Sequence, residues 1–276
     1  EEKLFSTGTG FRHALNGVYF TMESRNLYGK HLTWGIGDAL GQVYDYKKAP
    51  GVNEMEYGAA KYAWDYYEFK PVLSSIWTEA YNVVANCNNI IQQIEYADPE
   101  IFAWKENEKA MIWGEALALR AFIQFDMLRL FAPALVANSA GIYIPYVTDF
   151  PYYGGQSALS VLETLEKIEA DLLLAKDMIM AYDTLNDANR RILGDQYRFR
   201  IHSFVSNTDD DSDIIPLPFY QYRGYRINAM AVTGMLARLY SYWGGEKLVE
   251  AAKNAQEVID FEWTDGKKAL FYTENG

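Results

Sequence analysis

The sequence predicts an all-α protein built from tetratricopeptide-like helical hairpins that carry long, irregular, aromatic-rich loops. Residues 77–88 and 114–133 are apolar over most of a helical surface, which indicates two buried helices. Prolines and capping residues stand where helical patterns end. Near the end of the chain, two helical patterns are separated by little more than Gly244–Gly245, so the helices must lie antiparallel as a hairpin.

Helical periodicity and stop signals place the first three helices at residues 8–22, 70–96 and 105–131. Lys70–Pro71 marks the entry to the second helix, and Asp98–Pro99 ends it. Pro133 ends the third. The polar residues inside these apolar helices need partners, because an isolated buried charge is costly.

Ser160 and Glu163 form a capping box that opens a fourth helix. Its apolar residues recur at helical spacing on one face: Leu162, Leu165, Ile168, Leu172, Ala175 and Ile179. The closing hairpin is expected at residues 227–243 and 247–260. Its second helix is amphipathic through Leu248, Ala252, Ala255 and Ile259. The segments 35–69, 134–156 and 185–226 remain as long connections, and long loops in compact domains are usually functional or disordered.

Composition limits the classes of function. The chain has 276 residues, half of them hydrophobic, which is ample for a core and fits a single domain over residues 1–276. No apolar run is long enough to cross a bilayer. The net charge of −12 argues against binding to nucleic acid or to anionic lipid headgroups.

The single cysteine, Cys87, excludes an intrachain disulfide and a thiolate metal cluster. It lies on an apolar seam whose members are spaced alternately by four and three residues, so we expect it in the core and not as a nucleophile. The three histidines, His13, His31 and His202, are scattered and show no zinc-ligand spacing. No nucleophile elbow or phosphate-binding loop is present, so we expect no catalytic residue, no metal and no cofactor.

Two sets of carboxylates have alternative interpretations. Asp209, Asp211 and Asp213 alternate as in a calcium loop, but the required glycine and bidentate glutamate positions are filled by other residues, which favours a solvated acidic loop. Glu115 and Asp126 could serve as the paired carboxylates of a glycoside hydrolase. Structural ion pairs are favoured instead, since Asp126 shares a helix face with Arg129 at a spacing of three.

Aromatic residues make up 16% of the chain, with 22 tyrosines and 7 tryptophans, and many lie between the predicted helices. An exposed Tyr or Trp ring can stack on the apolar face of a sugar, while nearby polar groups bind its hydroxyls. Lys61 stands among such residues in the 35–69 connection. We expect the glycan-binding residues to be Trp64, Tyr62, Tyr57, Asn53 and Tyr67. The alternative, that these rings close the ends of the helical stack, remains open.

The chain resembles the SusD/RagB family of surface glycan-binding lipoproteins of Bacteroidetes. One similar helix carries Trp77, Tyr81, Val84, Asn88 and Ile91. The next carries Gly114–Glu115–Ala116, Arg120–Ala121–Phe122 and Phe125, followed by Ile144–Pro145. A later helix carries Val161, Ile168, Asp171–Leu172 and Ala175, and the hairpin over residues 227–259 contains Ala237–Arg238–Leu239–Tyr240.

The resemblance implies a non-catalytic protein that binds an oligosaccharide or polysaccharide and delivers it to a SusC-like TonB-dependent transporter. It also implies exposure at the cell surface on the outer membrane, through a lipid on an N-terminal cysteine. Neither that cysteine nor a signal peptide is in this chain, and the usual C-terminal half is expected to be lacking. Two other functions stay open: a helical-repeat adaptor that binds a protein or peptide partner, and an all-helical glycoside hydrolase.

Overall fold

The computed structural model describes residues 3–46, 54–137, 140–183 and 223–262, and this part of the chain is mainly helical. The long helices are α1 (Gly8–Met22), α4 (Phe69–Glu95), α5 (Lys105–Phe131), α6 (Val161–Asp183), α9 (Ala229–Trp243) and α10 (Lys247–Asp260). The short helical elements are η1 (Leu4–Ser6), η2 (His31–Gly35), α2 (Ile36–Leu40), α3 (Glu54–Ala60), η3 (Pro99–Ile101) and η4 (Arg223–Tyr225). Strands β1 (Ile142–Ile144) and β2 (Leu159–Ser160) pair antiparallel, with Ile142 opposite Ser160.

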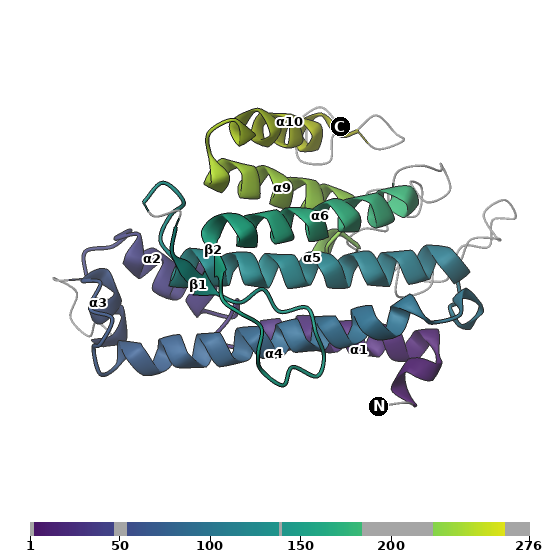
Figure 1. Ribbon diagram of the computed structural model, residues 1–276, viewed down its shortest axis with the longest axis horizontal. Helices are drawn as coiled ribbons and strands as arrows, with labels where there is room; N and C mark the ends of the chain where they lie inside the picture. Colours follow the sequence, from purple (N-terminus) through teal and green to yellow (C-terminus); the bar gives the residue numbers. More distant parts are fainter. Residues whose placement is uncertain (1–2, 47–53, 138–139, 184–222, 263–276) are drawn as a thin grey trace, which may run out of the picture.

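The long helices lie side by side in the order α1, α4, α5, α6, α9 and α10, and successive helices run in opposite directions (Figure 1). This stack of helical hairpins confirms the predicted fold class. Helix α5 lies in its middle, where most of its residues are buried between α4 and α6. None of the described helices is both long and apolar enough to cross a membrane.

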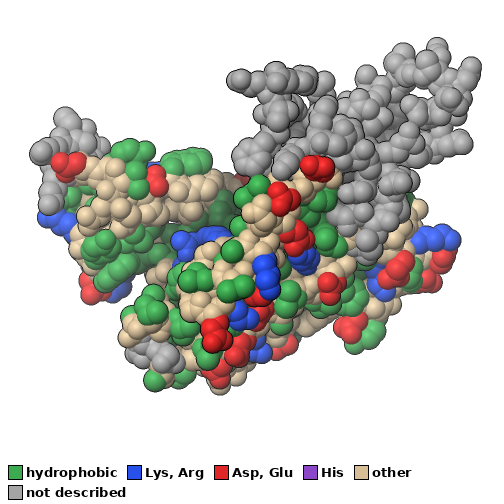
Figure 2. Space-filling view, turned by 90° about the horizontal axis from the view of Figure 1, so that it is seen from above, with side chains coloured by type: hydrophobic (Ala, Val, Ile, Leu, Met, Phe, Trp, Pro, Cys, Tyr) green, Lys and Arg blue, Asp and Glu red, His purple; other side chains and the backbone are tan. Residues whose placement is uncertain are grey.

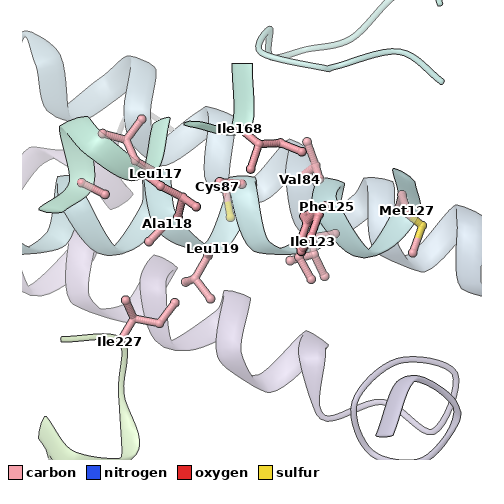
Figure 3. Packing of buried hydrophobic residues seen from close by; sticks show 14 of the residues in the cluster. Val84, Cys87, Leu117, Ala118, Leu119, Ile123, Phe125, Met127, Ile168 and Ile227 are labelled. Carbon is pink, nitrogen blue, oxygen red and sulfur yellow. The ribbon is translucent and has the colours of Figure 1, made fainter. Parts of the chain in front are cut away.

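The core follows α5 and the helices that flank it (Figure 3). Leu117, Leu119 and Ile123 of α5 are buried and belong to the same hydrophobic cluster as Ile168 of α6. Cys87 is fully buried in α4, which confirms its core position. Burial raises the pKa of its thiol to about 12, so the thiolate needed for reactivity is not formed at neutral pH.

The helix ends follow the chemistry of the sequence. The Ser160 hydroxyl accepts a hydrogen bond from the Glu163 amide at 3.2 Å, and the Ser160 amide donates to the Glu163 carboxylate at 2.9 Å, which confirms the capping box. The Asn228 side chain caps α9 by accepting from the Ala231 amide at 3.0 Å. Gly244 and Gly245 end α9 with φ values of +77° and +57°, which glycine adopts more readily than other residues.

The structure corrects three sequence predictions. The segment 35–69 is not an irregular loop throughout, because it contains α2 and α3. The apolar stripe predicted on the last helix faces outward: Leu248 is 53% and Ile259 39% exposed, whereas Ala251 and Asn254 are buried. The packed face is therefore rotated away from the larger aliphatic residues. Leu162, at 39% exposed, also lies off the buried face of α6.

A buried polar network joins three helices to the segment after β1. Arg120 of α5 donates two hydrogen bonds of 2.7 Å to Asp171 of α6 and one of 3.0 Å to the Asn88 side chain of α4. Asn88 donates in turn to the Val147 carbonyl at 3.1 Å. The Tyr146 hydroxyl donates to Asp171, and the pKa of Tyr146 is raised by burial and by that carboxylate. These contacts fix the segment against the stack.

Glu115 and Asp126, the candidate carboxylates of a hydrolase, lie in ion pairs between elements. Glu115 accepts from Arg226 at 3.1 Å and from the Tyr19 hydroxyl at 2.8 Å. Asp126 accepts from Arg129 at 3.0 Å, from Arg238 of α9 at 2.6 Å and from the Tyr28 hydroxyl at 2.8 Å. The Asp126–Arg129 pair is as predicted. Both carboxylates hold the packing of neighbouring elements.

Candidate functional site

The aromatic-rich part of the chain forms a lobe at one end of the stack, made by α2, α3 and the start of α4 (Figure 1). Figure 2 shows this lobe at the left, separated from the main body by a hollow with hydrophobic and basic side chains along its edge. Within the lobe lies a pocket of about 500 Å³. Its lining residues are Gln42, Val43, Tyr44, Asp45, Tyr46, Tyr57, Ala60, Lys61 and Tyr62.

Two chain segments face each other across this pocket: residues 42–46, which follow α2, and residues 57–62, which end α3. Tyr44 and Tyr46 meet edge to face, with ring centroids 6.1 Å apart. On the opposite side, the Lys61 ammonium lies 4.1 Å from the Tyr57 ring centroid and donates to the Tyr57 hydroxyl. The pocket therefore combines aromatic faces with amine, amide and carboxylate groups, which is the mixture expected of a specific small-molecule site.

The predicted glycan-binding residues are only partly brought together. Tyr57 and Tyr62 line the pocket. Trp64 is outside it, 48% exposed, with its ring 6.3 Å from that of Tyr62 and 5.7 Å from that of Phe69. Tyr67 is turned toward Glu54, whose carboxylate accepts its hydroxyl at 2.9 Å. Asn53 lies outside the described residues.

Asp209, Asp211 and Asp213, for which a solvated acidic loop was favoured over a calcium loop, lie outside the described residues, as does His202. In the described ranges, no group of three or more His, Cys, Asp or Glu side chains is arranged to hold a metal ion.

Sequence reasoning did not assign Gln42, Tyr44, Asp45 or Tyr46 to the site. Tyr44 and Tyr46 were visible as part of the aromatic excess, but they stand more than ten positions before Tyr57 in the chain. Only the close approach of α2 and α3 brings the two segments together. The aromatic composition of residues 35–69 was the signal that could have included them.

Charged groups of both signs lie around the pocket, since Glu56 is paired with Lys30 at 2.9 Å. The pKa of Tyr46 is raised by burial first and then by the charges of Glu56 and Asp38. Beside the pocket, Glu54 has a lowered pKa because the hydroxyls of Tyr66 and Tyr67 donate to its carboxylate, and the same bond raises the pKa of Tyr66 to about 12. The charged lining side chains are Lys61 and Asp45, which are opposite in sign. The two charges offset each other, so the lining has no net charge to attract a strongly charged ligand.

His31 begins η2, which leads into α2, and its side chain is almost fully buried. Burial lowers its pKa, and the charges of Lys30 and Arg25 lower it further. We therefore expect His31 to contribute stability that is complete above about pH 6.5, the usual histidine pKa. That contribution is lost as the pH falls toward the folded-state pKa, because the unfolded chain binds the proton more readily. Urea unfolding at a series of pH values measures this loss.

The comparison for this prediction is His31→Gln, which cannot take up a proton. As the pH falls, the wild type should lose more unfolding free energy than His31→Gln does. A constant difference between wild type and His31→Gln across the pH range would contradict the assignment.

A comparison with known families matches this chain over residues 40–186 to the SusD-like family described as "starch-binding associating with outer membrane". The matched range covers more than half of the 276 residues and includes the pocket-lining residues, α3, α4, α5 and α6. The chain belongs to the SusD-like family. SusD-like protein P2 of Formosa agariphila is 25% identical over 187 residues, which cover 64% of this chain and 32% of that protein.

Solved structures extend the likeness of the fold to nearly the whole chain. A SusD superfamily protein from Bacteroides thetaiotaomicron superimposes with a TM-score of 0.64 and 20% identity, over 97% of this chain and 48% of that one. A SusD-like carbohydrate binding protein from Bacteroides vulgatus superimposes with a TM-score of 0.64 and 18% identity. That match covers 98% of this chain and 47% of the other. This SusD-like chain thus spans about half the length of those relatives. At these identities the likeness concerns the fold.

Proposed function

We propose that this SusD-like chain binds an uncharged oligosaccharide or polysaccharide in the pocket between residues 42–46 and 57–62, without cleaving it. The observation that carries the proposal is the pocket itself, with four tyrosines and polar groups of both hydrogen-bonding kinds in a single cavity. Tyrosine rings offer flat apolar faces for sugar rings, and the amine, amide and carboxylate suit hydroxyl groups. The family description as starch-binding supports the same class of ligand.

Among the described residues, those that line the pocket do not supply the pair of carboxylates that would cleave a glycan. Hydrolysis of a glycoside needs two carboxylates that face the bond. Asp45 is the carboxylate among the pocket-lining residues, whereas Glu115 and Asp126 form ion pairs in the helical stack. Release of reducing sugar from a bound glycan, by protein of verified purity, would overturn this part of the proposal.

Binding is tested by affinity electrophoresis and calorimetry against a panel of neutral polysaccharides and of sulfated or uronic ones. We expect retention by at least one neutral glycan and weaker or no retention by the anionic ones, because the pocket lining has no net positive charge. Retention by no glycan, together with capture of a peptide partner, would favour the helical-repeat adaptor instead.

The predicted role of Trp64 has a distinct test. Its ring does not line the pocket but lies 6.3 Å from the ring of Tyr62, which does, so a glycan chain that extends past Tyr62 can reach it. Trp64→Ala should therefore weaken binding of a long oligosaccharide by about tenfold and that of its shortest bound fragment much less. Tyr96→Ala, which removes an 84% exposed ring at the far end of α4, is the matched control. Equal affinities of wild type and Trp64→Ala for every chain length would remove Trp64 from the site.

We further propose that the bound glycan is passed to a TonB-dependent outer-membrane transporter at the cell surface, where an N-terminal lipid holds the whole protein. The family description as associating with the outer membrane supports this location. Affinity purification of the full-length protein from its native membrane provides the test. A co-purifying TonB-dependent transporter is the expected result, and fractionation of the protein away from the outer membrane would contradict it.

A further inference from the structure

The two sides of the pocket are joined by a pair of residues with unusual backbone conformations. Gln42 has φ +52° and Tyr62 has φ +54°, in the left-handed region that residues other than glycine rarely adopt. Among the described residues, Lys105 is the remaining non-glycine with positive φ. Two of the three such residues therefore face each other at this pocket. Strained conformations persist where surrounding contacts hold them, and they concentrate at functional sites.

Those contacts are hydrogen bonds between the strained residues and the two chain segments. The Gln42 side-chain amide donates to the Ala60 carbonyl at 3.2 Å and to the Tyr62 hydroxyl at 3.4 Å. The Tyr62 hydroxyl donates to the Leu40 carbonyl at 2.9 Å. The end of α2 and the end of α3 are thus cross-linked in both directions. We call Gln42 and Tyr62, with these bonds, the pocket lock.

The lock restricts what each tyrosine can offer a ligand. The Tyr62 hydroxyl has its proton committed to the Leu40 carbonyl. One face of Tyr57 lies against the Lys61 ammonium, 4.1 Å from the ring centroid. Tyr44, in contrast, is 62% exposed, and in the described part of the chain its ring neighbour is Tyr46, which stands nearly perpendicular to it at 87°. Tyr44 therefore presents the largest exposed ring among the pocket tyrosines.

We propose that Tyr44 is the ring on which a sugar unit stacks, and that Gln42 and Tyr62 are positioning residues which hold the two sides of the pocket at the right separation. The inference rests on the proposed glycan binding and assigns different tasks to residues of the same site. It gives Tyr62 an indirect role through its hydroxyl. Preorganisation of this kind raises affinity by reducing the conformational entropy that is lost on binding.

The test uses calorimetry on the full chain with a neutral glycan that the wild type is first shown to bind. Tyr44→Ala should weaken binding by about tenfold or more, whereas Tyr44→Phe, which keeps the ring, should stay within about threefold. Tyr62→Phe keeps its ring but loses the hydrogen bond to the Leu40 carbonyl. Gln42→Ala loses the hydrogen bonds to the Ala60 carbonyl and the Tyr62 hydroxyl. Both should weaken binding by about threefold to tenfold, with a less favourable entropy of binding. Tyr96→Ala should bind as the wild type does.

Thermal unfolding of each variant shows whether it is folded before its affinity is compared. Hydrogen exchange of residues 40–46 and 57–62 adds a readout of the lock itself, which should speed up in Tyr62→Phe and Gln42→Ala but not in Tyr44→Ala. Unchanged affinity in Tyr44→Ala would overturn the stacking role. If Tyr62→Phe has the glycan affinity and the hydrogen-exchange rates of the wild type, the positioning role of Tyr62 would be wrong. If the wild type binds no glycan of the panel, the proposed function fails first, and the inference fails with it.

Discussion

Replacing Asp171 with alanine is expected to destabilise the fold by about 3–5 kcal/mol, the usual effect of leaving one member of a buried ion pair without its partner. The Arg120 and Asp171 side chains are 7% and 13% exposed. Burial opposes the charge of Arg120, but its hydrogen bonds and its attraction to Asp171 raise the guanidinium pKa above the usual value. Without Asp171 that attraction is gone, but the guanidinium keeps its charge at neutral pH because its intrinsic pKa is above about 12. Urea unfolding, monitored by circular dichroism, measures the change in unfolding free energy.

The matched control is an ion pair of the same kind at the surface. Glu250 accepts from Lys253 at 2.7 Å on α10, but the two side chains are 44% and 65% exposed. Glu250→Ala should change the unfolding free energy by about 1 kcal/mol or less, because solvent screens exposed pairs. A similar small effect from both substitutions would mean that the polar network does not hold α5 to α6.

Gly114→Leu is the second substitution with a large expected effect, of at least about 3 kcal/mol, because it overpacks the contact between α5 and α6. A Cβ at this position would lie 2.6 Å from Cγ1 of Ile179 and 3.2 Å from the Ala175 carbonyl oxygen. Both neighbours belong to the body of a packed helix and cannot move independently. The unfolding free energy and the loss of near-ultraviolet circular dichroism report the effect.

Alanine substitutions separate this crowding from helix propensity. Replacing Gly with Ala in the middle of a helix usually raises the free energy of unfolding by about 1 kcal/mol. Gly234 in α9 has no atom within 4 Å of its ideal Cβ position, so Gly234→Ala should realise that gain. Gly114→Ala should instead destabilise, since the contact with Ile179 outweighs the propensity. Stabilisation in both alanine variants would show that the side chains between α5 and α6 rearrange at little cost to accept the added methyl group.

The extent to which the sequence predicts the fold depends on helix length. The bounds of α5 are those predicted at residues 105–131, because a long apolar helix that stops before a proline carries a strong signal. Helices α2 and α3 were missed, since five and seven residues are too few to show a helical period. The partner of Arg120 was not predictable either. Asp171 lies 51 positions later, and only the packing of α6 on α5 brings it near.

The candidate pocket could be predicted from the sequence as a region but not as a set of residues. Aromatic excess between helices indicated residues 35–69, where the pocket lies. Spacing could not show that Tyr67 turns to Glu54 or that Tyr44 joins Tyr57 across a cavity. Such pairings depend on the path of the backbone. At Gln42 and Tyr62 that path uses conformations which the residue types themselves disfavour, so no propensity rule leads to them.

At the pocket lock, the residues proposed to raise affinity are expected to lower the thermal stability of the fold. A non-glycine residue in the left-handed region carries roughly 1 kcal/mol of strain or more, which glycine would release. Selection of this chain for heat resistance alone should therefore favour Gln42→Gly, and would discard the side chain that ties α2 to α3. Thermal robustness and affinity would then move in opposite directions. Efforts to stabilise the protein without altering the proposed site should therefore leave these two positions unchanged and target the helices, at places such as Gly234.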